Sequence, residues 1–176
     1  MTYYDLGAYT RAITTTSPDA QTWFDRGLNW VFAFNHEEAI KCFAKALEHD
    51  PACAMAHWGI SYAAGPNYNL PWHLYDPAGK ARALAAAYDA MQLALAHAAH
   101  VSPVEQALIH ALPARYPQRE PIEDQSGWDR AYTSAMRKVF AANQADLDVR
   151  CVFVEAIMNE TPWQMWDLTT GGVAKD

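Results

Sequence analysis

Apolar residues recur at helical spacing along most of the chain. In residues 36–49 one side of a helix would carry Ala39, Ile40, Phe43, Ala46 and Leu47. The opposite side carries Glu37 with Lys41 and Lys45 with Glu48, pairs that are typical of a solvated helix face. A second apolar stripe runs through residues 77–99 and consists of Leu84, Tyr88, Met91 and Leu95. Runs of Val, Ile and Thr that would indicate strands are nearly absent, so the pattern predicts an all-α fold.

Helix starts are marked by Ser, Thr or Asp followed directly by proline. The first residue can cap free helix amides, and proline suits the first helical position because its missing N–H had no partner there. These dipeptides are Ser17-Pro18, Asp50-Pro51, Asp76-Pro77, Ser102-Pro103 and Thr161-Pro162. At Ser102 and Thr161 a Glu or Gln follows three residues later, as in a capping box, and Asn35 marks one more start. The predicted helices are 18–34, 36–49, 51–64, 77–99, 103–114, 126–143 and 147–160, followed by a short turn from residue 162.

Most connections between these helices are a few residues long, so neighbouring helices should pack as antiparallel hairpins. Two connections are longer, residues 65–77 and 116–128, and both are too rich in Pro, Gly and Asn to be helical. A long loop between short-turned hairpins needs an explanation, and residues 66–77 are therefore treated as an insert.

Residues 20–51 resemble one repeat of the tetratricopeptide repeat (TPR) family. The residues that match the family's consensus positions are Trp23, Gly27, Trp30, Ala39, Phe43, Ala46 and Pro51. The chain as a whole is similar to bacterial TPR-domain proteins of unassigned function. The resemblance implies a single domain, 1–176, of about seven helices stacked as a right-handed superhelix. Residues 52–103 would be a repeat with the inserted loop 66–77, residues 104–160 degenerate hairpins, and residues 167–176 a flexible tail.

The TPR resemblance also implies that the first helix of each hairpin lines a concave groove. With the insert, this predicts an aromatic ligand-binding groove formed by Phe24, Leu28, Val31, Trp58, Tyr62, Asn67, Tyr68, Trp72 and His73. Aromatic rings with polar tips are frequent anchors of binding surfaces. Two other interpretations stay open. Some of these side chains could pack beneath the N-terminal segment or further repeats, and the insert could be a structural lid over one rim of the groove.

Metal binding is a weaker hypothesis. His36, His57 and His73 lie on neighbouring elements and, with a carboxylate such as Glu37, would suit zinc, copper or iron if they converged. Their spacing is not diagnostic, and residues 36–40 contain no HExxH motif. We therefore predict no metal site and no cofactor.

Composition narrows the possible functions. A formal charge of −7, with thirteen scattered Lys and Arg residues, argues against a nucleic-acid surface. Cys42, Cys53 and Cys151 form no CxxC pair, and the chain has neither a GxSxG elbow nor a phosphate-binding glycine loop. The N-terminal sequence lacks the pattern of a signal peptide, and no window approaches the ~18 apolar residues of a membrane span. These absences favour a cytoplasmic protein and do not favour an enzyme.

The sequence therefore favours a helical-repeat scaffold that binds a protein or peptide segment, with neither nucleic acid nor membrane as partner. The alternative is a metal-dependent or small-molecule-binding protein, possibly an enzyme, with a pocket under the insert. A third possibility is an assembly element that contacts copies of itself. The apolar run near the C-terminus, with Phe153, Ile157, Trp163 and Trp166, predicts that further repeats or another chain cover the last helix.

Overall fold

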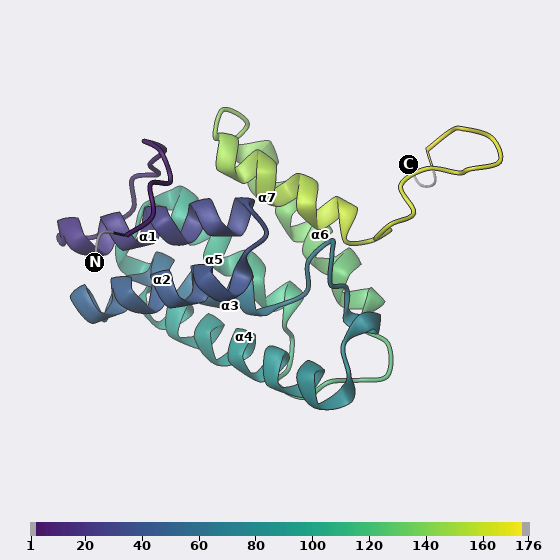
Figure 1. The fold of residues 1–176 in the computed structure, drawn as a ribbon, viewed down its shortest axis with the longest axis horizontal. Helices are drawn as coiled ribbons and strands as arrows, with labels where there is room; N and C mark the ends of the chain where they lie inside the picture. Colours follow the sequence, from purple (N-terminus) through teal and green to yellow (C-terminus); the bar gives the residue numbers. More distant parts are fainter. Residues whose placement is uncertain (1–2, 174–176) are drawn as a thin grey trace.

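The computed structural model describes residues 3–173, and all its regular elements are helical (Figure 1). Within that range there are two isolated β-bridges and no β-strand. The α-helices are α1 (Pro18–Phe32), α2 (His36–His49), α3 (Ala54–Ala64), α4 (Pro77–His97), α5 (Pro103–Arg115), α6 (Ser126–Ala142) and α7 (Leu147–Met158). Two single 3-10 turns are η1 (Trp72–Leu74) and η2 (Ala98–His100). The predicted all-α class with seven helices is confirmed.

Most helix starts follow from the capping residues in the sequence. The side chains of Ser17, Asn35 and Asp76 accept hydrogen bonds from main-chain N–H groups in the first turns of α1, α2 and α4. At the start of α5, Ser102 and Glu105 form a complete capping box. These bonds pair amides that have no partner inside the helix, which is why the predicted starts agree with the observed ones.

One of the predicted starts is wrong. Asp50 ends α2 instead of starting the next helix, and its carbonyl accepts a hydrogen bond from the N–H of Cys53, so α3 begins only at Ala54. A local hydrogen-bonded turn there uses an amide that a helix start would have needed. The stretch after Thr161 forms a short turn, as predicted from residue 162, with Trp163 at a positive φ of 65°.

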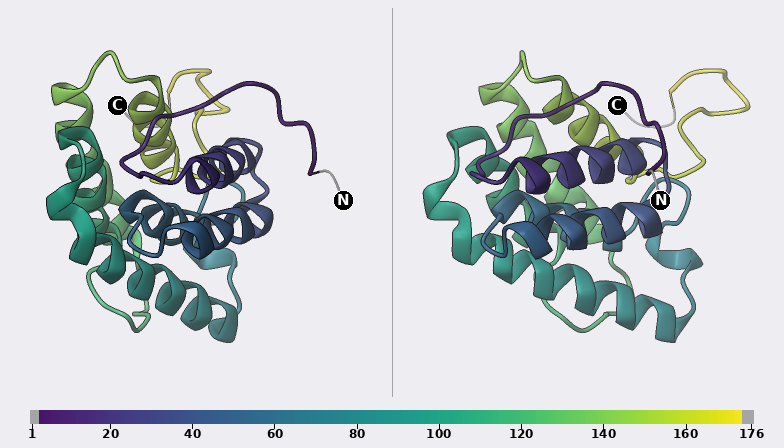
Figure 2. Two further views of the ribbon diagram at one scale, coloured as in Figure 1. Left: turned by 90° about the vertical axis from the view of Figure 1, so that its left-hand side faces the viewer. Right: turned by 60° about the vertical axis from the view of Figure 1, so that its left-hand side comes forward.

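Helices that follow one another in the sequence lie side by side (Figure 2). α1 packs on α2, α2 on α3, and α3 on α4, and the same holds for α5, α6 and α7. Weaker contacts join α1 to α3 and α3 to α5. The short connections between most of them make the neighbouring helices antiparallel.

Phe43 of α2 is the central side chain of the first three helices. Its ring lies against the backbone of both Gly27 in α1 and Gly59 in α3. A Cβ added at Gly27 would stand 2.5 Å from a ring atom of Phe43, and one at Gly59 would stand 2.6 Å away. The two glycines therefore allow three helices to close around one fully buried aromatic ring.

Arg115, at the end of α5, is buried where the insert meets the helices, with 1% of its surface exposed. Its guanidinium carbon lies 4.8 Å from the ring centres of both Tyr62 and Tyr132, and Nη2 donates a hydrogen bond of 2.5 Å to the carbonyl of Pro66. Cation–π contacts of this kind are strongest where water is excluded. Arg115 of α5 therefore connects the start of the insert, at Pro66, to Tyr62 of α3 and Tyr132 of α6.

The last helix leaves much of its apolar surface uncovered. Phe153 is buried, but Ile157, Trp163 and Trp166 are 41%, 64% and 60% exposed. Beyond α7 the chain turns back on itself, with Asp167 and Gly172 joined by a main-chain hydrogen bond of 2.9 Å. The predicted flexible tail is described only as far as residue 173, and residues 174–176 lie outside the described part. A covering partner for α7 stays a prediction. Among residues 3–173, the helices are all too short or too polar to cross a bilayer.

Candidate functional site

The five predicted groove residues of α1 and α3 are largely core residues. Phe24, Leu28 and Trp58 have at most 2% of their surface exposed, so the prediction that they line an open groove is wrong. Large apolar side chains gain more from burial between helices and beneath neighbouring segments than from lining a solvated surface. Val31 and Tyr62 are also buried, at 5% and 4% exposed, but each keeps an edge on a surface pocket.

That pocket, called here the apolar pocket, lies between α1, α3 and α7 and has a volume of about 400 Å³. Apart from Arg150, His36 and Glu155, its wall is formed by the apolar or weakly polar side chains of Val31, Phe32, Phe34, Tyr62, Cys151, Val154 and Met158. Phe32, Phe34 and Val154 are 37%, 45% and 52% exposed, so the wall is open to a binding partner. An apolar concave surface with a few polar groups at its edge is the usual form of a ligand pocket.

Glu155 provides the acidic group of the apolar pocket. Burial raises its pKa to about 7, although hydrogen bonds from the Asn159 side chain and from the main chain of Tyr68 oppose that rise. The bond from Tyr68 connects α7 to the insert. Near neutral pH this carboxyl group therefore exists in both charged and neutral forms.

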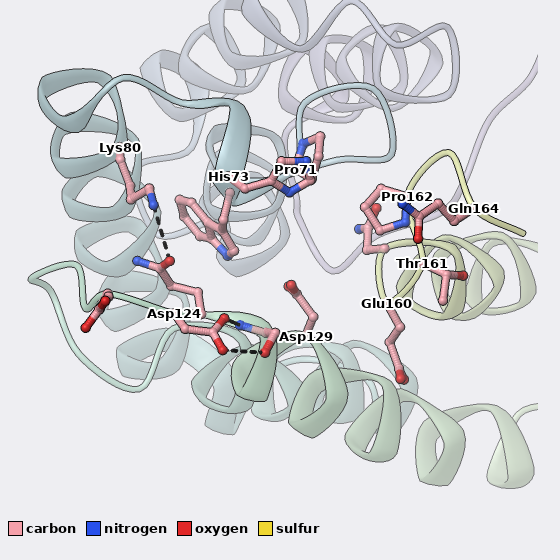
Figure 3. Close-up of a pocket in the computed structure, with 14 residues that line it drawn as sticks. Pro71, His73, Lys80, Asp124, Asp129, Glu160, Thr161, Pro162 and Gln164 are labelled. Atoms are coloured by element: carbon pink, nitrogen blue, oxygen red, sulfur yellow. Dashed lines mark hydrogen bonds between the residues drawn. The ribbon is translucent and has the colours of Figure 1, made fainter. Parts of the chain in front are cut away.

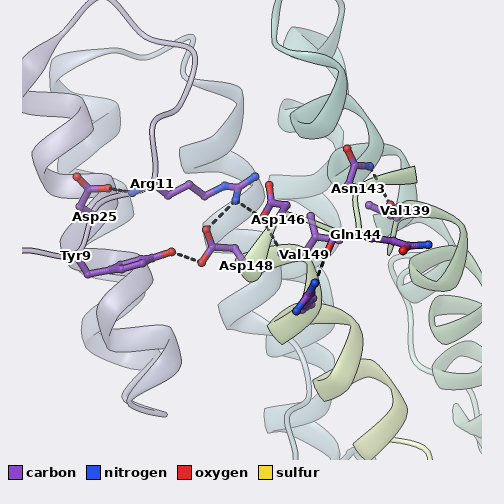
Figure 4. Close-up of polar contacts among 10 residues, drawn as sticks. Tyr9, Arg11, Asp25, Val139, Asn143, Gln144, Asp146, Asp148 and Val149 are labelled. Carbon is purple, nitrogen blue, oxygen red and sulfur yellow. Dashed lines mark hydrogen bonds and ion pairs between the residues drawn. The ribbon is translucent and has the colours of Figure 1, made fainter. Parts of the chain in front are cut away.

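An N-terminal segment, residues 9–15, precedes α1 and contacts both Asp25 of α1 and the start of α7. Figure 4 shows its contacts with α7: Arg11 Nη1 lies 2.8 Å from Asp146 and 2.7 Å from Asp148, and the Tyr9 hydroxyl donates to Asp148. Burial alone would raise the pKa of Asp146, but the bonds and charge of Arg11 outweigh it and lower that pKa. Arg11 is 9% exposed, so the ion pairs are largely shielded from water.

The insert is packed against the helices instead of standing free. The Asn67 side chain is buried and accepts hydrogen bonds from the main chain of Asn69 and Leu70, so it organises the loop. Trp72 is 4% exposed and belongs to η1, so the prediction that it lies outside any helix is wrong. Tyr68 stacks on Trp163 at 5.7 Å. These contacts agree with the lid interpretation, because the rings of the insert contact their own chain.

His73 is the exposed member of the predicted insert residues and lies at the edge of a polar pocket of about 280 Å³ (Figure 3). The wall of this polar pocket comes from the insert, α4, the loop before α6, the start of α6 and the turn after α7. Its charged residues are Lys80, Glu123, Asp124, Asp129 and Glu160. Burial raises the pKa of Asp129 to about 7, and the nearby Arg115 charge only partly opposes this rise. Two buried atoms in the wall, Trp72 Nε1 and Asn159 Oδ1, have no hydrogen-bond partner.

A larger cleft of about 760 Å³ lies directly under the insert. It is bounded by the α1–α2 turn, the end of α3, Asn67, Leu70 and Tyr75 of the insert, and Arg82 of α4. His36 lies in its wall, and burial lowers the pKa of that imidazole. A pocket under residues 66–77, which the sequence only suggested, is therefore present.

The three histidines considered as metal ligands are not brought together. His36 lies in the cleft under the insert, His73 faces the polar pocket, and His57 stacks on His97 with its Nε2 3.1 Å from the carbonyl of Pro51. Within residues 3–173 no group of three or more His, Cys, Asp or Glu side chains is placed to hold a metal ion.

Sequence reasoning overlooked Arg115, Asp129 and the N-terminal segment. Arg115 directly follows the predicted helix 103–114, and Asp129 stands beside Arg130 on the predicted helix 126–143. Nothing in the sequence separates a buried charge from an exposed one. Arg11 stands in a stretch rich in threonine that has no helical period, and its partners lie more than 130 residues away. The one sign of this contact in the sequence is Arg11 itself, an isolated cation in a polar segment.

No protein-family model, curated protein or solved structure matches the chain.

Proposed function

We propose that the chain is a TPR-type helical-repeat module that binds a segment of a partner protein on its inner face. In this proposal the hairpins α1–α2, α3–α4 and α5–α6 stack as a right-handed superhelix, and α7 starts a further hairpin. The contacts of α1 with α3 and of α3 with α5 support such a stack, as does the packing of Phe43 between Gly27 and Gly59. The class of partner is a protein or peptide, not a nucleic acid.

The observation that carries the proposal is the apolar pocket between α1, α3 and α7. It joins Val31 and Tyr62, two residues expected to face the groove, to the exposed Val154 side chain of α7. Its volume of about 400 Å³ suits one or two large apolar side chains of a partner. An irregular segment, residues 9–15, already lies against α1 and the start of α7, two of the helices that form the pocket. A surface that holds an extended segment of the chain favours a peptide as the partner over a compact ligand.

Val154→Asp is expected to weaken binding of a peptide with an apolar anchor by at least about tenfold, because a carboxylate would enter the pocket wall. Peptides selected on the wild-type protein from a random phage-displayed library serve as probes, and titration calorimetry measures the affinity. Ile157→Asp is the matched control, since Ile157 is exposed on the same helix but does not line the pocket. No selectable peptide, or equal losses in both variants, would contradict the proposal.

A second candidate function is binding of a small polar molecule in the polar pocket beside the insert. The raised pKa of Asp129 and the two unpartnered atoms, Trp72 Nε1 and Asn159 Oδ1, favour it. Because carboxylates outnumber cations in the wall, the expected ligand is a small amine. 1,4-Diaminobutane is a suitable probe, and 1,4-butanediol is its neutral control.

Asp129→Asn is expected to remove part of the pH dependence of stability. A carboxyl group whose native pKa is about 7 binds its proton more tightly when folded, so wild-type stability should fall as pH rises from about 4 to about 7. Thermal melts of both proteins across this range measure the contribution of Asp129 alone, because Glu155 is present in each.

The diamine, and not the diol, should raise the wild-type melting temperature at pH 8 and have less effect on the Asp129→Asn variant. Equal responses to both compounds would exclude an amine site.

A further inference from the structure

The N-terminal segment has the burial pattern of a bound extended peptide. From residue 11 to residue 17 the odd-numbered residues are buried or half-buried and the even-numbered ones are exposed. Arg11 and Ile13 point inward, and Ile13 packs against the hydrophobic core. Residues 9–13 have neither helix nor strand of their own, so the surface beneath holds the segment in place.

The helices hold the main chain of this segment through their side chains. Gln21 donates from Nε2 to the carbonyl of Arg11 at 2.8 Å and accepts from the N–H of Ile13 at 3.0 Å. Asp25 accepts from the N–H of Arg11 at 3.0 Å, and Glu105 accepts from the N–H of Thr14 at 2.7 Å. Such bonds hold a backbone whatever its side chains are, which is how a groove binds an extended ligand.

The groups that hold the segment are also fixed by other parts of the fold. Gln21 and Asp25 hydrogen-bond each other at 3.0 Å, and Glu105 closes the capping box of α5. Asp146 caps α7 by accepting from the N–H of Val149. Side chains oriented in this way lose little conformational entropy when a ligand binds.

Specificity comes from the inward side chains. Arg11 Nη1 reaches both Asp146 and Asp148, a site that selects a cation with long reach. Ile13, two residues later, contacts the core, and the Thr15 hydroxyl donates to Asp50 at 2.6 Å. The pattern read by the groove is therefore an arginine followed two residues later by a β-branched aliphatic residue.

We propose that residues 9–15 are an internal ligand, and that the groove also accepts an extended partner segment carrying arginine two residues before a β-branched aliphatic residue. The proposal rests on the proposed peptide-binding function and adds the class of partner. Tethering gives the internal segment a high effective concentration, so a partner binds only when it displaces that segment. Releasing the segment raises the apparent affinity, because a larger fraction of the molecules then has an open groove.

The test uses the full chain and a fluorescently labelled peptide with the sequence of residues 8–16, AYTRAITTT. Arg11→Ala in the protein weakens the internal ligand and leaves the groove intact, so the peptide should bind this variant at least about tenfold more tightly than wild type. Asp148→Ala breaks the same ion pair but removes the group that the arginine of the peptide would also contact. This variant should therefore give no such gain in peptide affinity. A peptide with glutamine in place of arginine should lose binding to the Arg11→Ala protein.

The opposite effects of the two variants are the decisive result. If Arg11→Ala and Asp148→Ala change peptide affinity alike, or if the glutamine peptide binds as well, the segment is only a structural clasp and the proposal fails. Circular dichroism checks the helices, and if Arg11→Ala loses helicity, Tyr9→Phe decides instead. That variant removes only a hydroxyl from a side chain that is 43% exposed, and it should give a smaller gain in affinity. No gain with a folded Tyr9→Phe protein would then overturn the proposal.

Failure of this proposal can be separated from failure of the proposed function. No residue of the N-terminal segment lines the apolar pocket. Val154→Asp should therefore leave binding of the labelled peptide to the Arg11→Ala protein unchanged.

Discussion

Gly27→Leu is expected to lower the free energy of unfolding by about 3 kcal/mol or more. In an exposed helix, replacing glycine normally stabilises the protein, by roughly 0.5–1 kcal/mol for alanine. Here the first added atom would stand 2.5 Å from the Phe43 ring, which is fixed from the other side by Gly59. Because the ring has no free space on either side, α1 or α3 must move away. Denaturant unfolding followed by circular dichroism measures the loss.

Two further variants separate this overlap from a general effect of losing glycine. Gly127→Ala lies in the first turn of α6 with only the end of Arg130 nearby, so it should be neutral or slightly stabilising. Phe43→Leu combined with Gly27→Ala should recover part of the stability that Gly27→Ala alone loses. An unchanged midpoint for Gly27→Leu would remove the TPR register assigned to residues 20–51.

Arg115→Ala is expected to cost about 3–5 kcal/mol of stability, because it leaves a cavity and an unpaired carbonyl at Pro66. Arg115→Met fills most of the volume and removes a buried charge, so its loss should be less than half as large. Both variants remove the positive charge that lowers the pKa of Asp129, so that pKa should rise further above about 7. Denaturant unfolding and carboxyl titration by NMR measure the two effects.

Arg119 provides the matched control for Arg115. It lies four residues further on and forms an exposed two-bond pair with Asp89, at 2.8 and 2.9 Å. Arg119→Ala should therefore change stability by less than about 1 kcal/mol. Equal losses at the two arginines would mean that the burial of Arg115 contributes nothing of its own.

The helices could be predicted because their signals are local. The apolar stripe of residues 36–49 and the caps at Ser17 and Asp76 act within a few residues of the element that they define. The same locality explains the error at Asp50-Pro51. The dipeptide has the form of a helix start, but the carbonyl of Asp50 accepts a hydrogen bond from the N–H of Cys53 and the helix begins only at Ala54.

The candidate site could be predicted only in part, because it depends on contacts between distant segments. The TPR resemblance predicted that Val31 and Tyr62 face a groove, but whether such a residue lines a groove or the core depends on what lies over it. The insert, α7 and residues 9–15 decide that point, and their positions are set by Arg115 and Arg11. An arginine among polar neighbours has the same local pattern whether it is solvated or fully enclosed.

The contact between Arg11 and Asp148 spans 137 residues, and this separation imposes an order on biosynthesis. Chains leave the ribosome from the N-terminus, and the first hairpins can fold while later ones are still being made. The N-terminal segment cannot reach its aspartates until α7 has emerged. The nascent protein therefore passes through a stage in which its first helices exist but the two aspartates do not, and Gln21 and Asp25 of α1 are then the groups that can hold the main chain of the segment.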